Sequence, residues 1–189
     1  MTRRKFKLNL SDLLSKNLIL ISLTLTFVIF LCIGSFTAKS IDTSTAARLS
    51  SIITAPHISK LTSFFISFIV CAFYFAIIFF CSSGFAGSIF IYAINAYKAY
   101  GIGFITGFIY GHFGNKAFLF VSLGIMPYAV LSAGLLLFYS KFAVEHSLNN
   151  RAASKQNTGV LELLYQGVFL LLINIIPVLY ETFITSLII

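Results

Sequence analysis

Long runs of apolar residues are the feature that most limits what this chain can fold into. The first run reads LILISLTLTFVIFLCIGSF and covers residues 18–36 without a charged side chain. A helix needs about 20 mainly apolar residues to cross a hydrocarbon core roughly 30 Å thick, and helices satisfy their own backbone in lipid. Because 59% of the 189 residues are hydrophobic and 10% are charged, little chain remains for a soluble domain. We therefore expect an all-α polytopic membrane protein.

The apolar runs predict about five transmembrane helices in one integral membrane domain, residues 1–189. The expected spans cover about residues 17–36, 61–81, 88–112, 117–140 and 163–189. Two longer polar segments separate some of these spans. We interpret residues 37–60 as an external loop and residues 141–158 as a cytoplasmic loop.

The external loop contains a short pattern of its own. Leu49, Ile52 and Ile53 fall on one helical face shortly before Pro56. Apolar residues at this spacing predict an amphipathic helix that lies on the membrane surface. The loop as a whole is too short to hold a catalytic domain.

Lysine and arginine residues set the expected orientation of the spans. Eight lie on the inner side of this arrangement, four on the outer side and one, Lys98, within a span, which accounts for all 13. The positive-inside rule then predicts an inner N-terminus and an outer C-terminus. Since these charges flank apolar runs, the net charge of +8 indicates orientation in a lipid bilayer and no nucleic-acid binding. Residues after Phe36 lack an A-x-A pattern, so we expect a retained anchor instead of a cleaved signal peptide.

The stretch AYKAYGIGFITGFIYGHFG, residues 96–114, is rich in glycine. A dinucleotide-binding loop needs G-x-G-x-x-G between a strand and a helix, but here the third glycine comes one residue too late and the flanks are apolar. The small residues recur every four positions instead, at Ala99, Gly103, Gly107 and Gly111. Such a stripe lets a second helix approach closely, so we expect helix packing at these residues.

Lys98 lies roughly 15 Å into its span, near the middle of the membrane. An ammonium at that depth costs about 2.5 to 3.5 kcal/mol on insertion scales, so it should face the bundle interior and have a partner. Glu181 differs from it in expected depth by about 6 Å, which is within reach of a lysine side chain. Our hypothesis is an intramembrane charge pair between Lys98 and Glu181. The alternative is a lysine satisfied by carbonyl groups or water.

Two prolines interrupt predicted spans. Pro127 removes the hydrogen bond to the carbonyl of Leu123, and Pro177 removes the one to the carbonyl of Ile173. Breaks of this kind build substrate or ion sites in some transporters and are plain kinks elsewhere. We predict kinks, because few amide side chains accompany them.

No arrangement of side chains in the sequence predicts catalysis. The histidines and cysteines are scattered over different spans and loops and form no C-x-x-C or Cys/His cluster. They are His57, His112, His146, Cys32, Cys71 and Cys81. We expect no catalytic residue, no metal site and no cofactor.

Several segments together resemble the stage II sporulation protein M family of bacterial membrane proteins. The glycine-rich segment with Lys98, Gly101 and Gly103 resembles a span of that family that ends in a Lys-Gly pair, and LGIMPYAVLSAGLLL resembles a span with a central proline. The segment YETFITS resembles its closing signature, with Glu181 as the acidic residue and Ser186 where relatives carry proline. The resemblance covers roughly residues 64–186.

The resemblance implies a non-enzymatic, multi-pass scaffold in a bacterial cell membrane. Such a protein anchors or localises peptidoglycan-degrading partners, the stage II sporulation proteins P and D, while the forespore is engulfed. The expected partners are thus other membrane or cell-wall proteins and the lipid bilayer. The alternative function is a small transporter or permease subunit that uses Lys98 and Glu181 within the membrane.

Overall fold

The computed structural model describes residues 17–53, 60–84, 86–113, 117–118, 120–152 and 158–188, and every element within them is helical. The expectation of an all-helical protein is therefore confirmed. The elements are α2 (Leu18–Lys39), α3 (Thr43–Ile53), α4 (Lys60–Ser82), α5 (Gly87–Phe113), the π-helix η1 (Phe120–Ile125), α7 (Met126–Ala152), α8 (Thr158–Ile173) and α9 (Ile175–Ile188).

Four helical stretches of the described chain are long and apolar enough to cross a membrane. They are Leu18–Lys39, Lys60–Ser82, Val121–Leu148 and Gly159–Phe183. The last two each combine two elements, η1 with α7 and α8 with α9. Helix α5 has 27 residues, which is also long enough, but Asn95 and Lys98 make it less apolar than these four.

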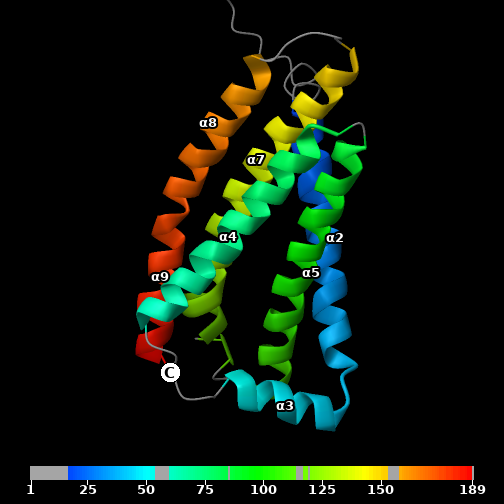
Figure 1. Ribbon diagram of the computed structural model, residues 1–189. Helices are drawn as coiled ribbons and strands as arrows, with labels where there is room; N and C mark the ends of the chain where they lie inside the picture. Colours follow the sequence, from blue (N-terminus) through cyan, green and yellow to red (C-terminus); the bar gives the residue numbers. More distant parts are fainter. Residues whose placement is uncertain are drawn as a thin grey trace, which may run out of the picture.

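The helices lie in an elongated bundle with α3 across one end (Figure 1). Helices α2 and α5 run in parallel, side by side, and make the most extensive helix contact in the structure. Helix α4 crosses the bundle obliquely, and α8 and α9 follow one another along its opposite edge. The turn from α4 to α5 and the start of α8 lie at the end away from α3.

Backbone contact explains why α2 and α5 pack so closely. A Cβ atom built on Gly103 of α5 would lie 2.0 Å from the carbonyl oxygen of Leu31 in α2. One built on Gly107 would lie 2.7 Å from the carbonyl oxygen of Ser35. On α2, a Cβ atom built on Gly34 would lie 2.2 Å from the carbonyl oxygen of Tyr100 in α5. At each of these contacts a glycine of one helix lies against the backbone of the other, as in G-x-x-x-G pairs.

The predicted stripe on α5 meets α2 over part of its length. Ala99 is fully buried in a cluster with Leu23 and Phe27 of α2, one turn before Gly103. At Gly111, no atom of the described residues lies within 4 Å of an added Cβ. The close contact thus involves Ala99, Gly103 and Gly107 and does not extend to Gly111 among the described residues.

Helix α3 lies across the ends of α2 and α5, within the segment expected to be an external loop (Figure 1). Its Ala46 is buried beside Phe108 and Ile109 of α5, and Leu49 packs against the same cluster. This position agrees with an amphipathic helix at a membrane surface. The side chains of the other two apolar residues in the predicted pattern lie outside the described ones.

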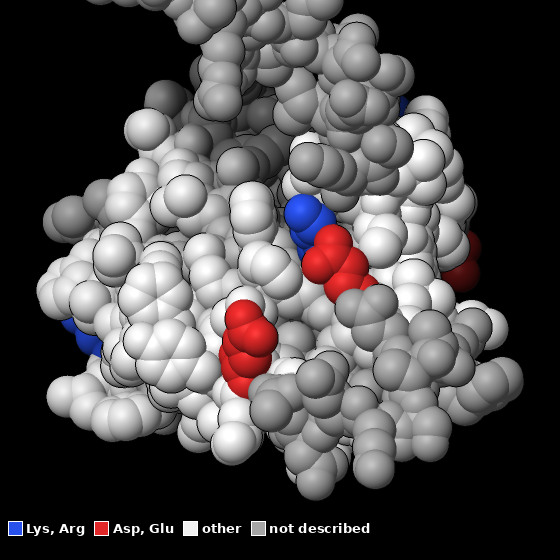
Figure 2. All heavy atoms as spheres, turned by 90° about the horizontal axis from the view of Figure 1, so that it is seen from above, with Lys and Arg blue, Asp and Glu red and all other residues white. Residues whose placement is uncertain are grey.

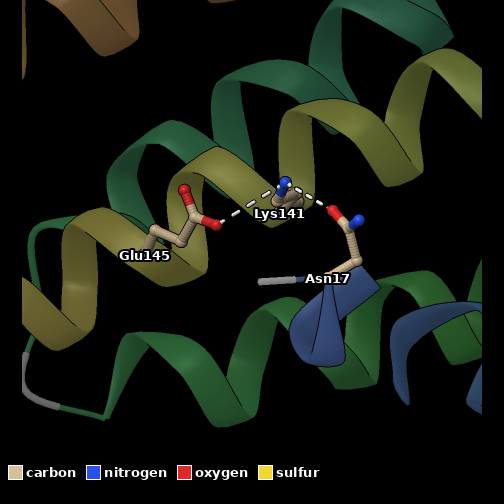
Figure 3. Close-up of polar contacts among 3 residues, drawn as sticks. All are labelled: Asn17, Lys141 and Glu145. Carbon is tan, nitrogen blue, oxygen red and sulfur yellow. Dashed lines mark hydrogen bonds and ion pairs between the residues drawn. The ribbon is translucent and has the colours of Figure 1, made fainter. Parts of the chain in front are cut away.

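The polar segment expected as the cytoplasmic loop 141–158 instead continues α7 as far as Ala152. Its apolar residues explain the difference, because Ala143 and Val144 are buried in the main core cluster. On the polar side, the Lys141 ammonium lies 3.8 Å from the Glu145 carboxylate one turn later (Figure 3). A helix that buries one face and pairs charges on the other needs no membrane around it.

Lys141 also joins this end of α7 to the start of α2. Its ammonium donates a hydrogen bond of 3.3 Å to the side-chain oxygen of Asn17 (Figure 3). Figure 2 looks onto this end of the bundle and shows a basic side chain touching an acidic one. The contact holds α2 in register with α7 at the end away from α3.

Irregular backbone lies beside both intramembrane prolines. The π-helix η1 directly precedes Pro127, and the last predicted span divides at Asn174 into α8 and α9, just ahead of Pro177. Because proline has no N–H to donate, the helix cannot continue regularly through the residue it would have bonded. The prolines therefore coincide with two interruptions, one at the start of the stretch formed by η1 and α7 and one between α8 and α9.

Candidate functional site

Lys98 of α5 points into the bundle between α4 and α7. Its ammonium donates a hydrogen bond of 3.0 Å to the hydroxyl of Ser132 in α7. It also lies 5.2 Å from the ring centroid of Tyr74 in α4, which is a cation–π distance. Lys98 lies about 17 Å along α5 from its first residue, and these contacts stabilise its charge inside the bundle.

Asn95, one turn before Lys98, fixes α5 against α7. It is fully buried, and its side-chain nitrogen donates to the hydroxyl of Ser140 at 2.7 Å and to the carbonyl of Ile91 at 2.8 Å. A buried amide bonded across two helices sets their rotation and relative height. Asn95 therefore helps to place the Lys98 ammonium opposite Ser132.

The polar contacts continue from Ser132 to Cys71 and Tyr128. The sulfur of Cys71 in α4 lies 3.8 Å from the Ser132 hydroxyl and 3.7 Å from the Tyr128 hydroxyl. Both partners belong to α7, and Ser132 is fully buried. These residues extend the cluster from Lys98 towards α9.

Glu181 of α9 lies at the other side of the same cluster. Its carboxyl group is hydrogen-bonded to Ser67 of α4 and interacts electrostatically with Tyr128. Lys98 and Glu181 thus belong to one polar cluster, which Ser132 and Tyr128 connect. The direct Lys98–Glu181 pair stays a hypothesis.

A pocket adjoins the Lys98 side of this cluster. It has a volume of about 570 Å³, within the size range of ligand sites. Lys98 and Ser132 supply its polar groups together with four tyrosines, and Ala129 of α7 and apolar residues of α5 form the rest of the wall. The tyrosines are Tyr74, Tyr97, Tyr100 and Tyr128. The arrangement offers a cation and several hydroxyl groups within an otherwise apolar enclosure.

A side chain from α9 supplies a hydrogen-bond donor to the backbone at the interruption beside Pro127. The hydroxyl of Tyr180 donates a hydrogen bond of 2.8 Å to the carbonyl oxygen of Leu123. This is the carbonyl that Pro127 leaves without its regular donor. An unsatisfied carbonyl in lipid would be costly, so Tyr180 stabilises the irregular η1 segment and ties it to the helix that carries Glu181.

Sequence reasoning identified Lys98 and Glu181 but missed the residues that connect them. A signal was present, because Ser67, Cys71 and Tyr74 share one face of α4 at helical spacing. Tyr128 and Ser132 likewise lie one turn apart on α7. A polar stripe on two apolar spans could have indicated that both helices face Lys98.

Neither metal-binding side chains nor known proteins add to this description of the site. In the part of the chain that the structure describes, no three His, Cys, Asp or Glu side chains come close enough together to hold a metal ion. Searches of protein-family models, curated proteins and solved structures found no match to this chain. The proposals below therefore depend on the geometry and on the sequence resemblance.

Proposed function

We propose that this chain is a five-span protein of a bacterial cell membrane, with an inner N-terminus and an outer C-terminus, that acts as a non-enzymatic scaffold. The close packing of α2 and α5 supports α5 as the fifth span. The two helices run side by side in parallel, so a membrane that α2 crosses is crossed by α5 as well. The partners of Lys98 inside the bundle remove the main objection to this placement.

The position of α3 is the observation that carries the scaffold function. In the proposed orientation α3 lies on the outer face, held in place by buried Ala46, while Ser44 and Thr45 are exposed. A helix docked in this way presents a fixed surface, so a partner need not spend free energy on ordering it. By the sequence resemblance, that partner is a peptidoglycan-degrading protein such as stage II sporulation protein P or D, acting during engulfment of the forespore.

Cysteine labelling tests the orientation. In a variant whose three native cysteines are replaced by alanine, we expect Ser44→Cys to react with an impermeant maleimide in intact cells. Asn150→Cys should react only after the cells are permeabilised, because the last turns of α7 lie at the end of the bundle away from α3. Labelling of Asn150→Cys in intact cells would contradict the proposed orientation.

The scaffold function is tested through the exposed face of α3. The double variant Ser44→Arg/Thr45→Arg should keep its membrane level but lose co-purification with a wall hydrolase, and sporulating cells should show delayed engulfment by membrane staining. The matched control is Glu162→Arg, an exposed substitution at the start of α8, at the other end. It should leave both readouts unchanged. Normal engulfment in a deletion strain would contradict the sporulation function.

A second candidate is a small transporter or permease subunit. The interruptions η1 and Asn174 favour it, because they lie in the chain segments that carry Tyr128 and Glu181, and transporters often build sites at broken helices. Asn174 is almost completely buried, and its amide has no hydrogen-bond partner among the described residues. An ATPase that co-purifies with this chain would favour this function over the scaffold.

A further inference from the structure

The α4–α5 face carries two hollows that meet at a pair of tyrosines. One is the Lys98 pocket of about 570 Å³. The other has about 520 Å³ and extends towards the α4–α5 turn between apolar side chains. Tyr74 and Tyr97 line both, so the two hollows adjoin at these side chains, and together they are called the groove below. The apolar part is lined by Ile69, Val70, Phe73, Ile77, Phe90, Ala93 and Ile94.

The two parts of the groove differ in charge. The apolar part carries no ionisable group except the two shared tyrosines. The other part carries Lys98, whose ammonium contacts a hydroxyl and an aromatic ring, and neither of these groups has a negative charge. An ammonium has three donor hydrogens and pairs most strongly with an anionic oxygen. The groove therefore combines an apolar part with a part that contains one cation, close to the tyrosines that the two parts share.

We propose that this groove binds an anionic amphiphile with a small headgroup, of which a long-chain fatty acid is the simplest. The carboxylate accepts a hydrogen bond from the Lys98 ammonium, and the tyrosine hydroxyls around the pocket offer further donors. The acyl chain lies along the apolar part between α4 and α5, which is exposed to lipid at Ile69, Phe73 and Phe90. The ligand enters sideways from the bilayer.

Charge complementarity favours this ligand over a second copy of the chain. A helix from a second copy would have to bring an acidic residue to the depth of Lys98. The acidic residue that this chain has within its spans at that depth is Glu181, which is already hydrogen-bonded to Ser67 inside its own bundle. An amphiphile supplies the anion without that rearrangement. No residue of α3 lines either hollow, so the ligand site and the exposed face of α3 use different residues.

A matched pair of amphiphiles tests the proposal. The purified chain in detergent is incubated with equal amounts of oleate and oleyl alcohol, which share a chain and differ in head charge, and bound ligand is counted by native mass spectrometry. We expect oleate to be retained about tenfold more than oleyl alcohol, the ratio that one charge-assisted hydrogen bond provides. In Lys98→Gln the preference should fall to about one. Equal retention by the unaltered chain would overturn the proposal.

A second variant keeps the test informative if Lys98→Gln does not fold. An added Cβ at Gly101 meets no described atom within 4 Å, and Gly101 lines the Lys98 pocket, so Gly101→Leu fills the pocket without a backbone clash. It should abolish oleate retention. Gly134→Leu, at an equally open position outside both hollows, should keep it. Unchanged retention in Gly101→Leu would overturn the proposal.

Two further readouts separate other occupants. Acetate in millimolar excess should not displace oleate, because the apolar part of the groove contributes to binding; displacement would mean a site for small free anions and would overturn the lipid assignment. The chain should keep the same oligomeric state in Gly101→Leu. A dimer of the unaltered chain that dissociates in this variant would mean that a second copy covers the groove, which also overturns the proposal.

Discussion

Gly103→Leu is expected to prevent α2 and α5 from packing and to leave little folded protein after extraction in detergent. A Cβ atom at this position would lie 2.0 Å from the carbonyl oxygen of Leu31 and 2.8 Å from its carbonyl carbon. These atoms belong to the backbone of α2, so no side-chain rotation relieves the clash. The helices must separate over their central turns, and we expect a loss of about 3 kcal/mol or more. Thermal unfolding followed by size-exclusion chromatography measures the loss.

The control is Gly101→Ala on the same helix. This substitution changes helix propensity in the same direction as any glycine replacement, but its Cβ meets no described atom within 4 Å. It should leave the unfolding temperature unchanged or raise it slightly. A small effect of Gly103→Leu, similar to that of Gly101→Ala, would show that α2 and α5 are not in backbone contact.

The α2–α5 pair shows how far the sequence predicts packing in this chain. The spacing of Ala99, Gly103 and Gly107 predicts which face of α5 is approached, because small residues in a helix leave a groove. The spacing does not predict which other helix packs against that face of α5. On α2 the same contact contains Gly34, whose pattern is short, because only Ala38 follows it at the same four-residue spacing. Contacts between residues distant in the sequence determine which helix packs against this face, and a single sequence does not show which residues are in contact.

The intramembrane site shows a similar limit. Depth alone identifies Lys98 and Glu181, since a charge in hydrocarbon requires an explanation. Serine and threonine require no such explanation. Their hydroxyl groups in a span can donate a hydrogen bond to a carbonyl oxygen of their own helix one turn back, as those of Thr24 and Thr106 do here. Ser132 instead contacts the Lys98 ammonium. Both situations involve a side-chain hydroxyl group, so only the fold distinguishes a hydroxyl that bonds its own helix from one that bonds Lys98.

The continuation of α7 into the expected loop has a different cause. A hydropathy pattern distinguishes segments that can cross a membrane from segments that lie in water. The segment after Ser140 is too polar to be predicted as a span. It nevertheless forms a helix because Ala143 and Val144 reach back into the core. The sequence therefore predicts where the apolar span ends better than where the helix ends.

Charge reversal at Lys98 and Glu181 should produce the second large effect. Lys98→Glu places a second carboxyl group in the cluster that already contains Glu181, and Glu181→Lys places a second ammonium there. Removing one member of a buried pair costs about 3 to 5 kcal/mol, and a like charge adds to that cost. We expect either single variant to lose most of its folded yield. The matched control is Lys60→Glu, an exposed position at the start of α4, which should change stability by about 0.5 kcal/mol or less, as surface substitutions do.

The double variant Lys98→Glu/Glu181→Lys distinguishes a coupled pair from two independent charges. If the two side chains interact, directly or through Ser132 and Tyr128, exchanging them keeps one charge of each sign in the cluster, and the folded yield should recover in part. Recovery is expected to be incomplete because Ser67 contacts position 181 and is now opposite an ammonium. If each charge is instead satisfied locally, the two losses add and the double variant is worse than either single one. That additive result would rule out the pair and leave Lys98 free to hold an external anion.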